Sequence, residues 1–215
     1  MVNVLTIERE YASGANEIAR KVSERLGWAL WDQALTTEVA RLLECDCRHI
    51  EKQEEKRDPL YYRLFKSFLR GSYEGSLNAP NLKLADAEGI RCATEKLVTK
   101  LGKEGNCVIV GRGSAYYLHD SEQAFHVFVY APFGEKVRRL QATGKSEDEA
   151  LKLAETVDID RADFIRQHFG VEWPARQYFH LMVNSTMGED TVVETILDGL
   201  TLFRERCAGI AAGKG

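Results

Sequence analysis

Residues 2–27 have the sequence VNVLTIEREYASGANEIARKVSERLG, in which an apolar run precedes a polar loop and an amphipathic segment. The apolar run, 2–7, is bounded by polar residues and predicts a central strand of a parallel sheet covered on both faces. After the loop 8–14, the apolar residues of 16–26 recur at helical spacing, and Gly27 supplies a stop signal. This order of strand, loop and helix is typical of an α/β fold.

Further apolar runs and amphipathic segments follow in alternation along the chain. We expect strands at 28–31, 107–110, 125–130 and 180–183, and helices at 90–101, 135–142, 147–156 and from 189 onward. Alternating strands and helices predict a three-layer α/β/α fold with a five-stranded parallel sheet. Ligands of such sheets bind beyond the carboxyl ends of the strands.

A chain of 215 residues can bury one full core, so we expect a single domain over residues 1–210. Its core would comprise 1–32, 86–135 and 180–210, with a helical insertion at about 33–85, a lid at about 136–175 and a disordered tail at 211–215. The charge run 51–58 in the insertion is most simply a solvated helix face, and the aromatic residues at 61–68 are most simply core.

Composition and charge narrow the function classes. A formal net charge of -4 argues against wrapping by a nucleic acid polymer and against an anionic membrane surface. No apolar run approaches the roughly 20 residues needed to cross a bilayer, which favours a cytoplasmic location. An odd number of scattered cysteines favours reduced thiols, and neither the Cys45–Cys47 pair nor any histidine has the spacing of a metal site.

The loop 8–17 lies where a nucleotide kinase keeps its phosphate loop, between the first strand and the first helix. In the pattern G-x-x-x-x-G-K, glycines let backbone N–H groups converge on phosphate, and the lysine balances charge on the transferring group. Here Arg9 stands at the first glycine, Gly14 at the second and Ala15 at the lysine. Taken alone, this loop would not identify a kinase.

Several motifs that occur in order along nearly the full chain are more specific. They are TIEREYASG at 6–14, Trp31-Asp32, CVIVGRG at 107–113, YAPF at 130–133, DRADF at 160–164 and VNST at 183–186. Together they resemble the cytidylate kinase-like family, whose phosphate loop R-E-Y-G-S-G-G-R-E-I also lacks the lysine. This chain departs further from that pattern, with Ala12, Ala15 and Asn16 in the loop and Gly113 where an aspartate usually follows the arginine.

The resemblance implies a P-loop kinase-like fold in which the insertion binds a nucleoside monophosphate and the lid closes over it. It also implies ATP and Mg²⁺, the metal being bound through the nucleotide. The implied site residues are Ser13, Gly14, Ala15, Asn16, Glu17 and Asn184 for ATP and its phosphates, Asp32 and Arg112 for the acceptor, and Arg138, Arg161 and Arg9 for catalysis. No residue is expected to form a metal site of its own.

For several of these residues a structural role is an open alternative. Asp32 could be a helix N-cap, and Arg112 could hold a structural carboxylate instead of the acceptor phosphate. The segment 184–186 could be a simple strand-ending turn. Arg139 and Arg166 could form exposed salt bridges on helices.

The resemblance predicts an ATP-dependent phosphotransferase that acts on a nucleoside monophosphate, with CMP or dCMP the first choice. Ala15, Asn16 and Gly113 motivate a competing hypothesis, a pseudokinase that binds nucleotide without turnover. A third hypothesis keeps phosphotransfer and changes the acceptor, because acceptor choice would lie in the insertion. Small nucleotides are the expected partners, and the sequence does not fix the oligomeric state.

Overall fold

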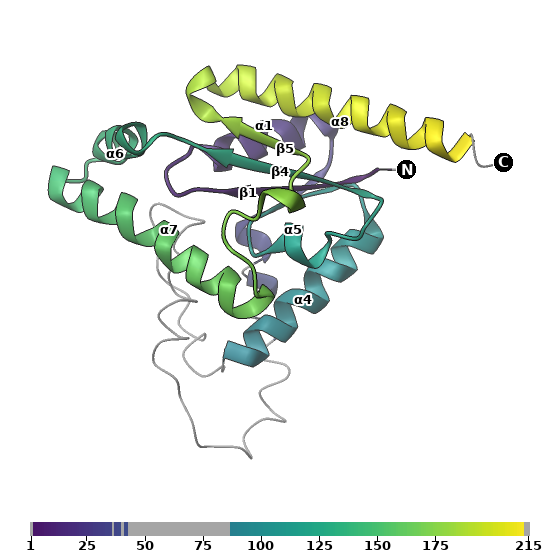
Figure 1. Cartoon of the computed structure of the whole chain (residues 1–215), viewed down its shortest axis with the longest axis horizontal. Coiled ribbons are helices and arrows are strands. Elements are labelled where there is room, and N and C mark those ends of the chain that lie inside the picture. Colours follow the sequence, from purple (N-terminus) through teal and green to yellow (C-terminus); the bar gives the residue numbers. More distant parts are fainter. Residues whose placement is uncertain (1, 36, 40, 43–86, 213–215) are drawn as a thin grey trace, which may run out of the picture.

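A five-stranded parallel sheet forms the centre of the computed structural model, which describes residues 2–35, 37–39, 41–42 and 87–212 (Figure 1). The strands are β1 (Val4–Arg9), β2 (Ala29–Trp31), β3 (Cys107–Val110), β4 (Ala124–Tyr130) and β5 (Leu181–Asn184). They are ordered β2-β3-β1-β4-β5. The first strand in the chain is therefore the middle strand of the sheet, and it pairs in parallel with both β3 and β4.

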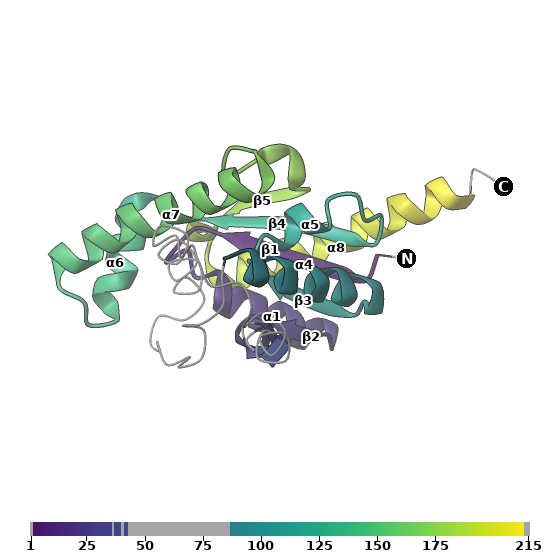
Figure 2. The same ribbon diagram turned by 90° about the horizontal axis from the view of Figure 1, so that it is seen from below.

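Helices cover both faces of the sheet. They are α1 (Ala15–Leu26), α4 (Ala87–Glu104), α5 (Ser114–Tyr117), α6 (Phe133–Ala142), α7 (Glu147–Phe169) and α8 (Glu189–Ala212), with short 3₁₀ helices η1 (Arg176–Tyr178) and η2 (Ser185–Met187). Figures 1 and 2 show α1 and α8 on one face and α4 and α5 on the other. The helix α6 follows the carboxyl end of β4, and α7 runs back from beside α6 towards α5 (Figure 1).

The sheet is apolar on both sides because it is packed on both sides. Leu5 and Ile7 of β1 belong to a core cluster shared with α1 and α8, whereas Val4 belongs to a second cluster shared with α4. Each fully buried aliphatic side chain of this kind contributes about 1.5–3 kcal/mol to folding. The near-continuous apolar runs of β1 and β3 follow from this arrangement.

The three-layer α/β/α prediction is confirmed, and the strand order explains where a ligand would bind. The connection that leaves β1 runs to β2 on one side, and the connection that leaves its neighbour β3 runs to β4 on the other, so a crevice forms beyond the carboxyl ends of β1 and β3. The loop after β1 and the turn after β3 meet at this edge. Both carry residues that the sequence predicted for the site.

Several element ends differ from the prediction. β1 continues to Arg9 instead of ending at residue 7. The lid helix predicted at 147–156 continues to Phe169, because Val157, Phe164 and Ile165 extend its buried face. α8 continues to Ala212, so residues 211 and 212 of the expected disordered tail are helical, and 213–215 lie outside the described residues.

The predicted helical insertion lies mostly outside the described residues. Residues 33–35, 37–39 and 41–42 are helical, which fits its beginning. The charge run 51–58 and the aromatic residues at 61–68 fall in the stretch 43–86, which the structure does not describe.

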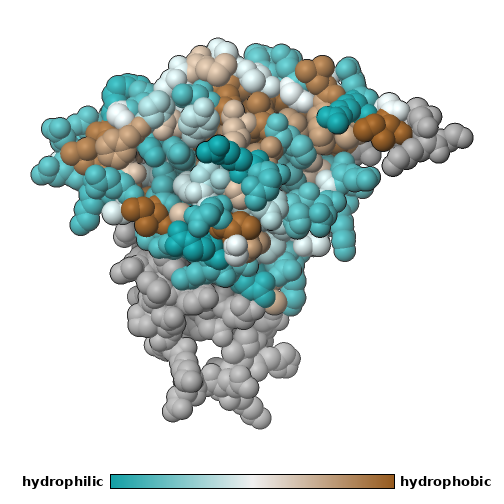
Figure 3. All heavy atoms as spheres, viewed as in Figure 1, coloured by the Kyte–Doolittle hydropathy of each residue, from teal (hydrophilic) through white to brown (hydrophobic). Residues whose placement is uncertain are grey.

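Hydrophilic side chains cover most of the face seen in Figure 3, and apolar side chains form small separate groups on it. The large exposed apolar side chains of the described residues are Phe133, Ile159, Met187, Leu202 and Ile210. They come from four different elements. None of the described helices is both long and apolar enough to cross a membrane.

Candidate functional site

The loop between β1 and α1 is tightly turned and largely buried. Ala12 has a φ of 55°, in the left-handed region that costs a residue with a side chain about 1–2 kcal/mol. Gly14 has a φ of 79° and directly precedes α1. Tyr11 and Ala12 pack under α6 and α7 in one apolar cluster with Leu140 and Val157. The loop therefore keeps its shape through contacts with the lid helices.

The predicted phosphate-binding residues 13–17 lie on this loop and on the first turn of α1. Ser13 is only 1% exposed, and within the described part of the chain its Oγ has no hydrogen-bond partner. The first N–H groups of a helix lack intrahelical acceptors and attract anions. Glu17 accepts a hydrogen bond of 2.9 Å from Nε of Arg20, so its side chain is engaged along α1.

Arg9, Arg112 and Arg161 form a buried cluster of positive charge beside the loop, with exposures of 6%, 3% and 4%. Nη2 of Arg9 lies 3.8 Å from Oδ1 of Asp32. The Arg9 guanidinium also packs against Gly111, where an added Cβ would overlap Nη1. The structure thus brings together four residues that the sequence assigned to catalysis and to the acceptor.

Burial and mutual repulsion lower the pKa of two arginines in the cluster. Burial lowers the pKa of Arg9 to about 10, and the charge of Arg161 lowers it too, against the opposing effect of Asp32 and Glu8. Burial and the charge of Arg9 lower the pKa of Arg112 to about 9. Burial raises the pKa of the Glu8 carboxyl. Both arginines still carry charge at neutral pH, and their mutual repulsion would be relieved by a bound oxyanion.

The turn after β3 aims Arg112 into the cluster through an unusual backbone. Gly111, Arg112 and Gly113 have successive φ values of 66°, 64° and 69°. Left-handed residues with side chains are strained and tend to occur at functional sites. At Gly113, an added Cβ would lie 3.0 Å from ring carbons of Phe169, so the space that an aspartate would need is filled.

On α6, the arginine that faces the loop is Arg139. Its Nη1 donates to Ser185 Oγ at 2.9 Å and to the Ala12 carbonyl at 3.4 Å, and its Nε donates to Glu135 at 2.7 Å. Arg138, predicted as catalytic, is 68% exposed and donates to Glu135 at 2.8 Å. The structure does not bring Arg138 to the loop, and its catalytic role stays a prediction.

Asn184 caps η2 at the end of β5. Its Oδ1 accepts hydrogen bonds from the Thr186 N–H at 3.0 Å and from Thr186 Oγ1 at 2.9 Å. The neighbouring Ser185 is the residue that meets Arg139. The segment 184–186 therefore lies beside the phosphate loop, while the predicted contact of Asn184 with adenine stays untested.

Sequence reasoning missed two charged residues that contact the loop, Lys136 and Asp158. Oδ1 of Asp158 accepts a hydrogen bond of 2.8 Å from the Tyr11 N–H, and Oδ2 accepts one of 2.9 Å from Lys136 Nζ. A signal was present in each case. Lys136 is four residues before the buried Leu140 on α6, and Asp158 is three residues before Arg161 on α7, spacings that share one helix face.

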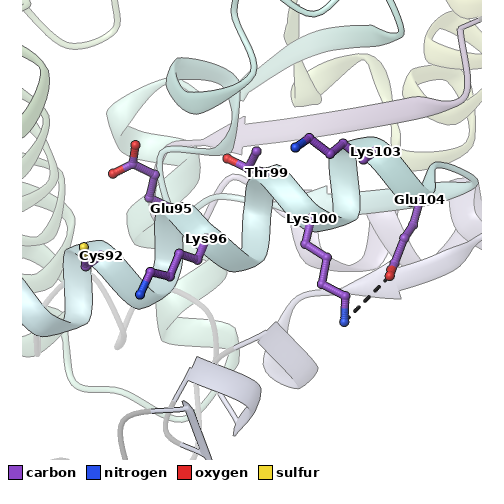
Figure 4. A pocket seen from close by; sticks show the side chains of 7 residues that line it. All are labelled: Cys92, Glu95, Lys96, Thr99, Lys100, Lys103 and Glu104. Atoms are coloured by element: carbon purple, nitrogen blue, oxygen red, sulfur yellow. Dashed lines mark ion pairs between the residues drawn. The ribbon is translucent and has the colours of Figure 1, made fainter. Parts of the chain in front are cut away.

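A hollow along α4 has a volume of about 720 Å³. Cys92, Glu95, Lys96, Thr99, Lys100, Lys103 and Glu104 line it (Figure 4). Its charges are mixed, and Lys100 pairs with Glu104 at 3.7 Å. None of the predicted site residues lies there.

No cluster of metal-ligating side chains occurs among the residues the structure describes. Cys92, Cys107 and Cys207 are free thiols, and the Cys45–Cys47 pair lies outside the described residues.

Several solved structures are similar to this chain at low sequence identity, among them an uncharacterized protein and two kinases. The uncharacterized protein, from Eubacterium ventriosum, has a TM-score of 0.64 and 16% identity over 94% of this chain and 99% of its own. A gluconokinase from Sinorhizobium meliloti has a TM-score of 0.54 and 14% identity over 95% of this chain and 94% of its own. A shikimate kinase from Bacteroides thetaiotaomicron has a TM-score of 0.50 and 13% identity over 94% of this chain and 99% of its own.

These similarities support the kinase-like fold. No curated protein is detectably similar in sequence. A family model, that of the cytidylate kinase-like family, matches residues 4–187 and so spans β1, both edges of the sheet, the lid helices and η2. The chain belongs to the cytidylate kinase-like family.

Proposed function

We propose that this protein transfers the γ-phosphoryl group of ATP to a nucleoside monophosphate, with CMP or dCMP as the first acceptors to test. The observation that carries the proposal is the buried arginine cluster beside the lysine-free phosphate loop. Phosphoryl transfer needs positioned positive charge more than covalent chemistry from the protein. The preference for a cytosine base rests on the family alone.

In this proposal the two substrates meet beyond the carboxyl end of β1. The loop and first turn of α1, residues 13–17, bind the phosphates of ATP, with Asn184 near the adenine. Ser13 supplies a buried hydroxyl to that site. Arg112 and Asp32 hold the acceptor, and a guanidinium group suits a phosphate because it can donate two parallel hydrogen bonds.

The positive charge that the missing lysine would supply comes from arginines. Arg9 and Arg161 are buried next to the loop, and Nη1 of Arg139 lies 3.2 Å from where a Cβ on Gly14 would be. Arg139 therefore joins Arg9 and Arg161 in the proposed catalytic set, whereas the exposed Arg138, which the sequence predicted as catalytic, is left out of it. Held at fixed positions away from bulk water, such groups stabilise charge that develops on the transferring phosphoryl group.

The described residues do not form a metal centre of their own, and Gly113 stands where the family usually has an aspartate. Magnesium would arrive bound to the phosphates of ATP and would neutralise part of their charge. The residues 13–17 would contact this metal only through the nucleotide.

A coupled assay with ATP, Mg²⁺ and a panel of nucleoside monophosphates tests the proposal. We expect turnover with CMP or dCMP, and a loss of about 100-fold in kcat/KM for Arg112→Ala, in line with removal of a charged group from a phosphate. Arg25→Ala is the matched control, because Arg25 lies on the surface of α1 and pairs with Glu194. Undiminished activity of Arg112→Ala would show that the acceptor site is wrongly assigned.

The panel also separates the competing functions. Nucleotide binding by calorimetry without phosphorylation of any acceptor would favour the pseudokinase, which Ala15, Asn16 and Gly113 motivate. Gluconate and shikimate belong in the panel, because proteins of similar fold are named for these acceptors. Phosphorylation of either compound instead of CMP would support the hypothesis of a kinase with a different acceptor.

A further inference from the structure

The backbone of the phosphate loop is held by charged side chains from the lid helices. The N–H of Tyr11 donates to Oδ1 of Asp158 at 2.8 Å, and Nη1 of Arg161 donates to the carbonyl of Arg9 at 2.8 Å. The same Arg161 nitrogen lies 3.1 Å from Oδ1 of Asp158. Two side chains on one turn of α7 thus contact the loop on either side of Glu10.

Lys136 of α6 joins the same network. Its Nζ lies 2.9 Å from Oδ2 of Asp158 and 3.2 Å from Oε2 of Glu10. That oxygen of Glu10 also accepts the N–H of Ala131 at 3.3 Å, just beyond β4. Both carboxylate oxygens of Asp158 are therefore engaged, and the contacts connect the loop with β4, α6 and α7.

The network is buried, so its charges depend on one another. Lys136 is 7% exposed, Arg161 is 4% exposed and Asp158 is 9% exposed. Hydrogen bonds that involve charged groups are stronger than neutral ones, and loss of one partner leaves the others buried without compensation. Asp158 is the member that contacts the loop backbone and both cations.

The loop itself needs such support. In place of glycine it has Ala12 at a φ of 55°, a conformation that an alanine adopts only when its surroundings impose it. The contact between Tyr11 and Asp158 fixes the residue directly before this alanine.

We propose that Asp158 is a positioning residue that holds the phosphate loop in its binding conformation before nucleotide arrives and ties the loop to the lid helix α7. The effect on turnover rests on the proposed kinase function, whereas the effect on the loop does not. Displacing a reacting group by about 1 Å lowers a rate by about 100-fold, so a carboxylate remote from the phosphates can control catalysis.

Hydrogen exchange of the nucleotide-free protein tests the structural part. The Tyr11 amide of the wild-type protein should exchange slowly, and Asp158→Ala should speed exchange of residues 9–14 by about 10- to 100-fold, the protection that a charged acceptor gives. Asp163→Ala is the matched control, because Asp163 lies on the same helix and pairs with Arg166 on the surface. Fast exchange of Tyr11 in the wild type, or an unchanged loop in Asp158→Ala, would overturn the proposal.

Asp158→Asn separates positioning from general stability. The amide oxygen can still accept the Tyr11 N–H, so this variant should recover most of the loop protection while it loses the ion pairs with Lys136 and Arg161. Equal exchange at residues 9–14 in the asparagine and alanine variants would contradict the assigned contact. If Asp158→Ala does not fold, hydrogen exchange at residues 9–14 of Asp158→Asn and at the Tyr11 amide of the wild type tests the proposal.

Kinetics test the catalytic part. With the preferred acceptor, Asp158→Ala should lower kcat by about 10- to 100-fold and change the KM for ATP less, because the loop remains but is less well oriented. A matching loss in Asp163→Ala would point to destabilisation instead of positioning. If the wild type phosphorylates nothing, the proposed function fails, while the exchange result still decides whether Asp158 holds the loop.

Discussion

At the scale of single residues, the site depends on side chains packed so closely that glycines are needed to make room. Gly111 borders the Arg9 guanidinium, Gly113 borders the Phe169 ring and Gly14 borders Arg139. All three have positive φ. Each glycine therefore has two separate roles, to allow the turn and to leave space for a neighbouring side chain.

We predict that Gly111→Ala displaces Arg9 and weakens binding of ATP or inorganic phosphate by at least about tenfold, since one charged contact is worth about that much. Because φ is 66° here, an alanine should also lower the free energy of unfolding by about 1–2 kcal/mol. Calorimetric titration and urea denaturation measure the two effects.

The variant Gly27→Ala separates the effect on ligand binding from the effect on stability. Gly27 has nearly the same φ, 65°, but a Cβ there would meet nothing within 4 Å. This variant should lose a similar amount of stability and bind ligand normally. Equal binding by the two variants would mean that Arg9 does not contact the ligand.

At the scale of elements, α6 presents different residues to the loop and to solvent. Lys136, Arg139 and Leu140 share the inward side, and Arg138 points outward to Glu135. Residues three or four apart lie on one helix face, whereas adjacent ones do not. Two neighbouring arginines on this helix therefore cannot act on the same phosphate in the same way.

We predict that Arg139→Ala lowers kcat/KM by about 10- to 100-fold, because it removes a cation beside the phosphate loop. Arg138→Ala, its adjacent control, should change kcat/KM less than about twofold, in line with an exposed ion pair. The coupled assay measures both. The opposite result would support the catalytic role that the sequence predicted for Arg138.

The sequence was sufficient to predict the five strands and the longer described helices, but not α5, the 3₁₀ helices or the contacts between elements. Apolar runs located the five strands because buried parallel strands are apolar throughout. The same criterion ended β1 too early, at the charged Glu8 and Arg9, because Ser114 donates to the Glu8 carboxylate and Arg161 donates to the Arg9 carbonyl, both from more than a hundred residues away. Asp158 was missed for the same reason, because its bond to the Tyr11 amide is a feature of the folded chain.

At the scale of the whole molecule, one buried histidine ties stability to pH. Nδ1 of His126, on β4, accepts a hydrogen bond of 2.7 Å from the Thr6 hydroxyl, and its Nε2 donates one of 3.2 Å to the Leu118 carbonyl. Both ring nitrogens of the neutral imidazole therefore have hydrogen-bond partners. Burial, with a smaller effect from His180, lowers its pKa to about 4. An unfolded histidine takes up a proton near pH 6.5.

The folded protein should therefore lose stability as pH falls from about 6.5 towards 4, where the unfolded chain binds one more proton. We predict a loss of about 2 kcal/mol in the free energy of unfolding between pH 7 and pH 5 from this residue. Urea denaturation at the two pH values measures it. In His126→Gln, which cannot titrate, the fall in the free energy of unfolding between pH 7 and pH 5 should be about 2 kcal/mol smaller than in the wild type. An identical pH dependence of the two proteins would contradict the prediction.

The position of β1 in the sheet has a consequence for synthesis on the ribosome. β1 is synthesised well before its sheet partners β3 and β4, which begin at Cys107 and Ala124. At about 5–20 residues per second, the nascent chain carries this apolar strand without a sheet partner for on the order of ten seconds. The strand that organises the finished site is thus the one that most needs protection from aggregation while the chain is being made.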